Sequence, residues 1–237
     1  TPGGNAGRCV VRNVIVARGK TMTKFCAFLL VAVCICWSLP GAAYVCTRSS
    51  ADGPSLAWGE REIELRVTNI DGNEISVASL QEGLEHAVNE WTDAAFCSDL
   101  VIRAGAPTNH TTAGFDWAAG SQDPANMNIV VFRKNESETT VDRWLYPLSA
   151  IALTTVTYVN SSGRILDADI ELNDAYHDFT NCDPGSSCIV ITDLKNTLTH
   201  ELGHVVGLDH PLGNDAQSVG ATMASSAPEG ELEKRDL

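Results

Sequence analysis

The stretch His200-Glu-Leu-Gly-His-Val-Val-Gly-Leu-Asp-His210, followed by Ala221-Thr-Met-Ala224, decides the interpretation of this chain. Residues four apart lie on one face of a helix, so His200 and His204 point the same way. Glu201 lies about 100° round that helix from the first histidine, where it can reach a water on a bound ion without binding the ion. Three imidazoles that leave a fourth position open are the ligand set of a catalytic zinc, whereas a structural zinc is usually closed by four protein ligands.

The third histidine requires the helix to end. His210 is six residues beyond His204, which is too far round to share its face in a continued helix. Gly207 supplies the turn, because glycine enters the left-handed region without a steric cost. Asp209 is an alternative ligand, but the spacing favours His210. An amphipathic core helix with incidental histidines is the alternative to a metal site, and the fixed spacing of the histidines and the glycine disfavours it.

This pattern resembles the signature of the metzincin clan of zinc endopeptidases, His-Glu-x-x-His-x-x-Gly-x-x-His with a downstream methionine turn. Within the clan, residues 58–237 are most similar to matrixin-like secreted bacterial proteases. The resemblance implies one catalytic zinc, bound by His200, His204 and His210. It also implies that Glu201 is the general base and that Met223 lies beneath the metal as an apolar floor. Protein or peptide would then be the substrate.

Departures from the family pattern are also informative. Pro211 follows the third histidine where matrixins usually have serine, and Ser225 stands where serralysins, which share that proline, carry a tyrosine ligand. The histidines of the structural zinc of animal matrixins have no counterpart, since His110 and His177 lack the spacing, so we predict no second zinc. By resemblance, residues 224–230 form the far wall of the S1′ pocket. A catalytically inactive zinc-binding domain, used for adhesion or inhibition, is the alternative function.

The first methionine, Met22, opens a segment with the form of a signal peptide. Lys24 provides a positive charge, residues 25–37 are apolar, and small residues precede a cleavage site predicted after Ala43. A membrane anchor is the alternative, although the apolar run is short for a bilayer. We expect an upstream non-structural segment (1–21), a signal peptide (22–43) and one secreted catalytic domain (44–237).

The charge of the chain limits its partners. The formal net charge is −14, and the predicted leader contains basic residues but no acidic ones, so the mature part is more acidic still. Such a surface repels nucleic acid and anionic lipid. We therefore expect no nucleic-acid binding, no stable membrane association after signal cleavage, and a monomer.

Export also predicts disulfides, which form in oxidising compartments. Cys182 and Cys188 close a short loop just before the zinc helix, and a bridge there stabilises the fold by about 2 kcal/mol in the loop-entropy estimate. Cys46 and Cys97 are then left to pair with each other. The alternative makes Cys46 a propeptide thiolate that caps the zinc, but no Pro-Arg-Cys-Gly context surrounds it.

The periodicity of the remaining chain predicts an α+β fold. Strict alternation predicts a strand over residues 60–70, and apolar residues at three- and four-residue intervals predict a long helix over residues 77–95. Ser76 or Ser79 caps this helix, and His86 on it is expected to have a structural role. Further strands are expected at Leu100–Arg103, Asn128–Arg133, Ile151–Val159 and Arg164–Asn173.

By resemblance, this order implies a metzincin-like catalytic domain. Its five-stranded twisted sheet has an antiparallel edge strand, residues 151–159, that lines the cleft and can pair with an extended peptide. The long helix and the zinc-binding active-site helix complete the domain.

Two stretches outside the motif also carry expectations. Alternating carboxylates are usually a solvated face, with calcium coordination as the alternative; here they are Asp167, Asp169, Glu171 and Asp174. The stretch Gly230–Leu237 begins like the final metzincin helix but stops after about two turns. We therefore expect a truncated copy of a longer protease, frayed from about Ser225 onward, with Met223 poorly clamped.

Overall fold

The computed structural model describes residues 45–94, 98–120, 123–134, 143–183, 187–211 and 220–237. All belong to one unit of the chain, residues 41–237, and a first unit, residues 1–40, lies outside the described residues. The predicted upstream segment and signal peptide are therefore also outside them. Within the described part of the chain, no helix has the length and apolar character needed to span a membrane.

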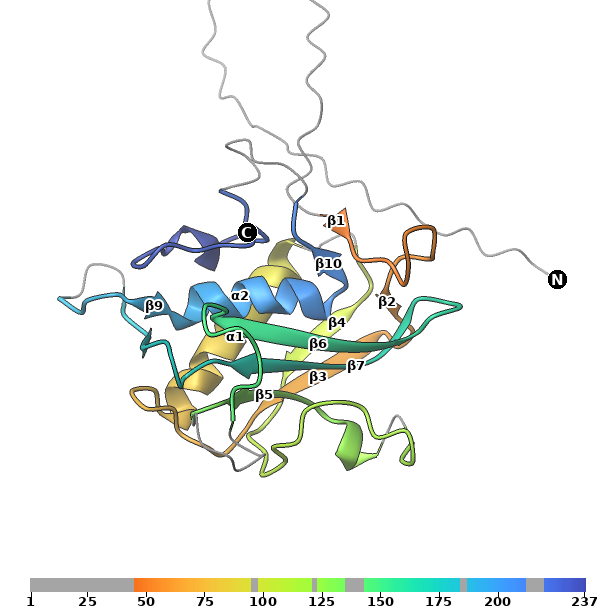
Figure 1. Ribbon diagram of the computed structural model, residues 1–237, viewed down its shortest axis with the longest axis horizontal. Helices are drawn as coiled ribbons and strands as arrows, with labels where there is room; N and C mark the ends of the chain where they lie inside the picture. The colour runs from red at the N-terminus through yellow and green to blue at the C-terminus, as the bar shows by residue number, and fades with distance from the viewer. Residues whose placement is uncertain (1–44, 95–97, 121–122, 135–142, 184–186, 212–219) are drawn as a thin grey trace, which may run out of the picture. The chain divides into compact units, whose positions relative to one another are not determined.

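A mixed, mostly parallel sheet forms the centre of the fold (Figure 1). Its strands are β2 (Ala57–Trp58), β3 (Glu62–Val67), β4 (Val101–Ala104), β5 (Asn128–Phe132), β6 (Ala152–Val159) and β7 (Arg164–Leu172). The order is β4-β3-β5-β7-β6, with all neighbours parallel except the antiparallel pair β6 and β7. Strand β6 is therefore an edge strand, as predicted, and the α+β class is confirmed.

The prediction of five strands is wrong by one. Strand β2 pairs in parallel with the start of β7, and the Ala57 amide donates to the Gly163 carbonyl at 3.0 Å. Two residues are too short to show an alternating pattern, so sequence periodicity could not find this strand. The other five strands agree with the prediction to within the usual uncertainty at element ends.

Two helices, α1 (Val77–Ala94) and α2 (Leu194–Val205), pack on one face of the sheet (Figure 1). Helix α1 begins after Ser76, whose Oγ accepts from the Ser79 amide at 3.2 Å. The Trp91 indole N–H of α1 donates to the Thr199 carbonyl of α2 at 2.8 Å. The buried side chains of α1 meet those of α2 and the sheet in one core; on α1 they are Leu80, Leu84, Ala87, Val88 and Trp91.

The opposite face of β7 is buried, so the prediction of a solvated acidic face is wrong. Asp167 and Asp169 are each 1% exposed, and Glu171 and Asp174 are also buried. A loop covers part of this face, since Asp169 accepts from its Gly114 amide at 2.6 Å; Asp169 also accepts from the Ile129 amide of β5 at 2.9 Å. Alternation correctly indicated that these carboxylates face away from the helices, but it contains no information about the loops that fold over them.

The remaining carboxylates have their own partners. Glu171 forms a buried ion pair with Arg133 and accepts from the Tyr146 hydroxyl at 2.8 Å. Asp174 accepts from the Asn73 amide at 2.6 Å. Among the described residues, no three of these carboxylates bring oxygens within 4.8 Å of one another. Calcium coordination, the alternative for these residues, therefore gains no support from the described carboxylates.

Asp167 differs from its neighbours, because both of its carboxylate oxygens are buried and accept no hydrogen bond from a described nitrogen or hydroxyl donor, which leaves the carboxyl of Asp169 as its partner. Burial, and then the charge of Asp167, raise the pKa of Asp169 to about 8, and burial also raises the pKa of Asp167. The folded protein therefore holds a proton at this pair that the unfolded chain releases at about pH 4.

We expect the substitution Asp167→Asn to stabilise the protein at pH 8. A proton held only by the folded state makes stability fall as the pH rises from about 4 to 8. The amide removes one charge and can donate to Asp169, so the variant should gain about 1–2 kcal/mol at pH 8 and little at pH 4. Urea unfolding at both pH values measures this gain, with the exposed Asp52→Asn as control. A wild-type pH slope in Asp167→Asn would contradict the assignment.

A disulfide joins Cys182 and Cys188, as predicted. It lies between β8 (Phe179–Thr180) and β9 (Thr192–Asp193), which pair in parallel immediately before α2. Cys46 is exposed and forms no disulfide with another described cysteine. Cys97 lies outside the described residues, so its pairing with Cys46 stays a prediction.

The C-terminal segment is not frayed, in contrast to the prediction. Residues 233–235 form a short 3₁₀ helix, η2 (Glu233–Arg235), packed against α2. The Arg235 guanidinium forms a buried ion pair with Asp193, in which Nε donates to Oδ1 at 2.7 Å, and it donates to the Cys182 carbonyl at 2.8 Å. The ion pair of Arg235, rather than burial of Leu232 and Leu237, holds this segment, and Leu237 is exposed. Whether the chain is a truncated copy of a longer protease stays a prediction.

Candidate metal centre

Helix α2 carries the first part of the site, and both of its ends are well defined. Asp193 caps the start, where its Oδ1 accepts from the Asn196 amide at 2.8 Å. At the other end Gly207 has φ +91°, and its amide donates to the His204 carbonyl at 3.0 Å. A Cβ at Gly207 would lie 2.7 Å from the Leu56 carbonyl oxygen. Both the positive φ and this close approach therefore require glycine. The predicted helix-ending turn is confirmed.

After the turn, a short pair of antiparallel strands directs the chain back towards α2. Strand β10 (Leu208–Asp209) pairs antiparallel with β1 (Val45–Cys46), and the Thr47 amide donates to the Gly207 carbonyl at 2.9 Å. This strand pair positions His210, the next residue. Asp209 does not belong to the group of converging ligand atoms, and its Oδ1 accepts from the His210 amide at 2.8 Å.

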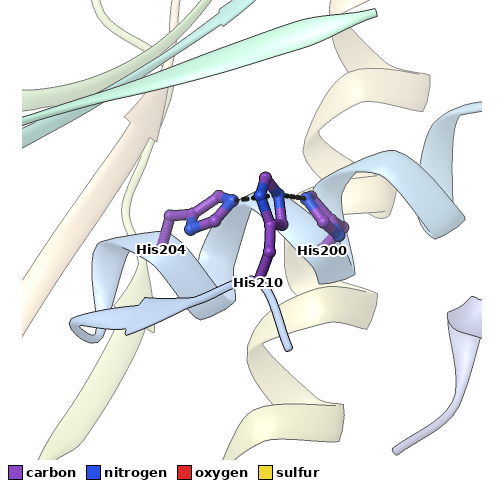
Figure 2. Close-up of side chains that lie close together, drawn as sticks. All are labelled: His200, His204 and His210. Carbon is purple, nitrogen blue, oxygen red and sulfur yellow. Dashed lines mark hydrogen bonds between the residues drawn. The ribbon is translucent and has the colours of Figure 1, made fainter. Parts of the chain in front are cut away.

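The three predicted histidines converge (Figure 2). The Nε2 of His210 lies 3.2 Å from that of His204 and 3.3 Å from that of His200. Two imidazoles on a tetrahedral zinc, with Zn–N bonds of about 2.0–2.1 Å, have their nitrogens about 3.3–3.4 Å apart. The spacing of these side chains is therefore the spacing that a zinc ion requires.

The outer nitrogens establish which ring atoms face the centre. His200 Nδ1 donates to the Thr222 carbonyl at 2.7 Å and His204 Nδ1 donates to the Leu208 carbonyl at 2.8 Å. A carbonyl only accepts, so in the neutral rings both Nε2 atoms carry lone pairs. Carbonyl partners of this kind orient histidine ligands in metal sites. Burial lowers the pKa of His200 to about 4 and also lowers that of His210, which favours the neutral form that binds metal.

Glu201 lies beside the histidines and is 6% exposed. Its Oε2 accepts from the Thr154 hydroxyl of β6 at 2.6 Å, which fixes one oxygen and leaves Oε1 for other contacts. Burial raises the pKa of this carboxyl. Thr154 is a site residue that sequence reasoning missed, because a threonine-rich segment is typical of any edge strand.

Met223 lies under the helix, in contrast to the expectation that it is poorly clamped. It is 1% exposed and belongs to the main core. A Cβ at Gly203 would overlap its sulfur, so the glycine between the two helix histidines makes room for the methionine. The Met223 position agrees with the predicted apolar floor.

A cleft of about 620 Å³ opens above these groups. Strand β6 lines one side of it, and Ala224, Ser225, Ser226 and Ala227 line another, as predicted for part of the 224–230 wall. Lys234 also reaches the cleft, although it is buried, and its ammonium donates to the Ser226 carbonyl. Thr47 lines the cleft but Cys46 does not, so the described geometry lends no support to a thiolate cap.

No model of a known protein family matches this sequence, and a search of curated proteins finds no match either.

Proposed function

We propose that this chain is a secreted zinc-dependent endopeptidase of metzincin type. The observation that carries the proposal is the convergence of three imidazole Nε2 atoms, with that of His210 at 3.2 Å and 3.3 Å from the other two, beside a buried carboxylate in an open cleft. Three histidines are the ligands of a catalytic zinc that keeps one position open. The Cys182–Cys188 disulfide supports an oxidising, extracellular location.

The residues of the chain have separate roles in the proposed reaction. A zinc ion held by His200, His204 and His210 supplies Lewis acidity and lowers the pKa of water towards about 7. Glu201 accepts the proton of the attacking water on Oε1 and later delivers it to the leaving amine. Thr154 holds Oε2 of that carboxylate throughout. The free edge of β6 beside the cleft suits an extended peptide backbone.

The test is digestion of casein by the purified mature protein. Cleavage that stops on addition of a chelator and returns with zinc, together with one tightly bound zinc per chain, is the expected outcome. A protein that binds zinc but leaves casein and a peptide library intact would instead favour the inactive adhesion or inhibitory domain. A protein that binds no metal would remove both proposals.

We expect Thr154→Val to lower kcat/KM about tenfold, because a hydrogen bond to a charged group is worth about 1.5–3 kcal/mol and part of that orients the base. Thr157→Val is the matched control, since Thr157 lies on the same strand but does not line the cleft. Peptide cleavage at several substrate concentrations measures both variants. Equal activity of the two would show that Thr154 does not position Glu201.

A further inference from the structure

A second group of metal-binding side chains lies apart from the histidine centre. In the described part of the chain, only one other set of His, Asp or Glu residues brings its ligand atoms within 4.8 Å of one another: His86, Glu90 and Asp236. The first two are on α1, four residues apart and therefore on one face of the helix. The third follows η2.

The histidine of this group is held by a backbone carbonyl. His86 Nε2 lies 3.1 Å from the Arg235 carbonyl, which only accepts, so Nε2 carries the proton and Nδ1 has the lone pair in the neutral ring. A backbone carbonyl on the outer nitrogen is the usual partner of a metal-bound histidine. The contact also fits the structural role predicted for His86, because it ties α1 to the C-terminal segment.

The acidic members of the group lie at or near the surface, with Glu90 half-buried and Asp236 exposed. Asp236 is adjacent to Arg235, whose guanidinium is anchored in the buried ion pair with Asp193. Among the described residues, neither Glu90 nor Asp236 forms an ion pair with a lysine or arginine. Two carboxylates held together in this way repel each other, and a cation between them removes that repulsion.

We propose that His86, Glu90 and Asp236 bind a divalent first-row transition ion such as Zn²⁺, with water completing its coordination. One imidazole and two carboxylates suit such an ion, whereas Ca²⁺ takes six to eight oxygen ligands. The ion joins the C-terminal segment to α1, and through Arg235 and Asp193 it supports the start of the helix that carries the histidine centre. The proposal departs from the expectation of no second zinc, which rested only on the missing histidines of the structural zinc of animal matrixins, and it does not depend on the proposed protease activity.

The experiment is a calorimetric titration of Zn²⁺ into mature protein that already holds one zinc ion. The wild type should bind a second, weaker equivalent. Glu90→Gln and Asp236→Asn should each weaken this second step at least tenfold while the first ion stays bound. Glu85→Gln is the matched control, because it removes the same charge from an exposed neighbour of His86 on the same helix.

Thermal unfolding gives an independent measurement. Excess Zn²⁺, at about one hundred times the second dissociation constant, should raise the midpoint of the wild type and Glu85→Gln by about 5–10 °C. Glu90→Gln and Asp236→Asn should show a much smaller rise. The proposal is overturned if the wild type takes up no second ion, or if both variants bind it as tightly as the control. Because the first ion is measured separately, that result would leave the histidine centre untouched.

Discussion

Glu201→Ala should retain its zinc and lose proteolysis by at least about 10²-fold, the usual size of a general-base effect. All three histidines and their carbonyl partners remain in the variant, so the metal content should equal that of the wild type. The lost group is the only carboxylate among the residues lining the cleft that is both buried and held by a hydroxyl of the edge strand. Metal analysis and peptide turnover on the same preparation measure the two effects separately.

The exposed Glu85→Ala, on helix α1 and outside the lining of the cleft, is the control and should cleave at the wild-type rate. If Glu201→Ala turned peptides over at a rate comparable with this control, Glu201 would have no place in the mechanism. If it lost zinc instead, its role would be to support the ligands.

Arg235→Met should be the most destabilising single substitution proposed here, at about 3–5 kcal/mol, which is the typical cost of leaving one partner of a buried ion pair alone. For a domain of this size that corresponds to roughly 10 °C in the thermal midpoint. The effect is large because Asp193 has a fully buried side chain that also caps α2. Loss of Arg235 therefore leaves the Asp193 carboxylate buried without a counter-charge. It also weakens the start of α2, the helix that carries His200 and His204.

Two comparisons separate this effect from simple loss of charge. Arg61→Met breaks an exposed pair with Asp99, whose side chains are 82% and 71% exposed, and should cost at most about 1 kcal/mol. The double variant Asp193→Asn/Arg235→Met should be less destabilised than the sum of the single variants. Equal midpoints for Arg61→Met and Arg235→Met would contradict a role for the C-terminal segment in holding the helix.

The convergence of the three histidines could be predicted because their arrangement is local. His200 and His204 are four residues apart on a helix, and Gly207 ends that helix. His210 follows three residues later, so the sequence spacing limits where its side chain can lie. The long helix and five of the six strands of the central sheet can be predicted for the same reason, since each is long enough to show its own period.

The features that were missed depend on segments distant in the sequence. Asp167 is buried by segments that are distant in the sequence. Alternation cannot distinguish a buried carboxylate face from a solvated one. Arg235 and Lys234 look like the charged end of a marginal helix until their partners, Asp193 and the Ser226 carbonyl, are known. Thr154 acquires its role only when β6 is placed against α2.

If the leader predicted before residue 44 is removed, the pairing of β1 with β10 would link that processing to the candidate metal centre. Two ligands are built into a helix, but the arm that carries His210 is held by the few residues from Val45 to Thr47. Leader removal after Ala43 would leave this strand intact, whereas a cut a few residues later would delete it. The choice of processing site would then act on metal retention through one histidine and leave the other two in place. A cut inside β1 would therefore leave the core folded but weaken metal binding through His210.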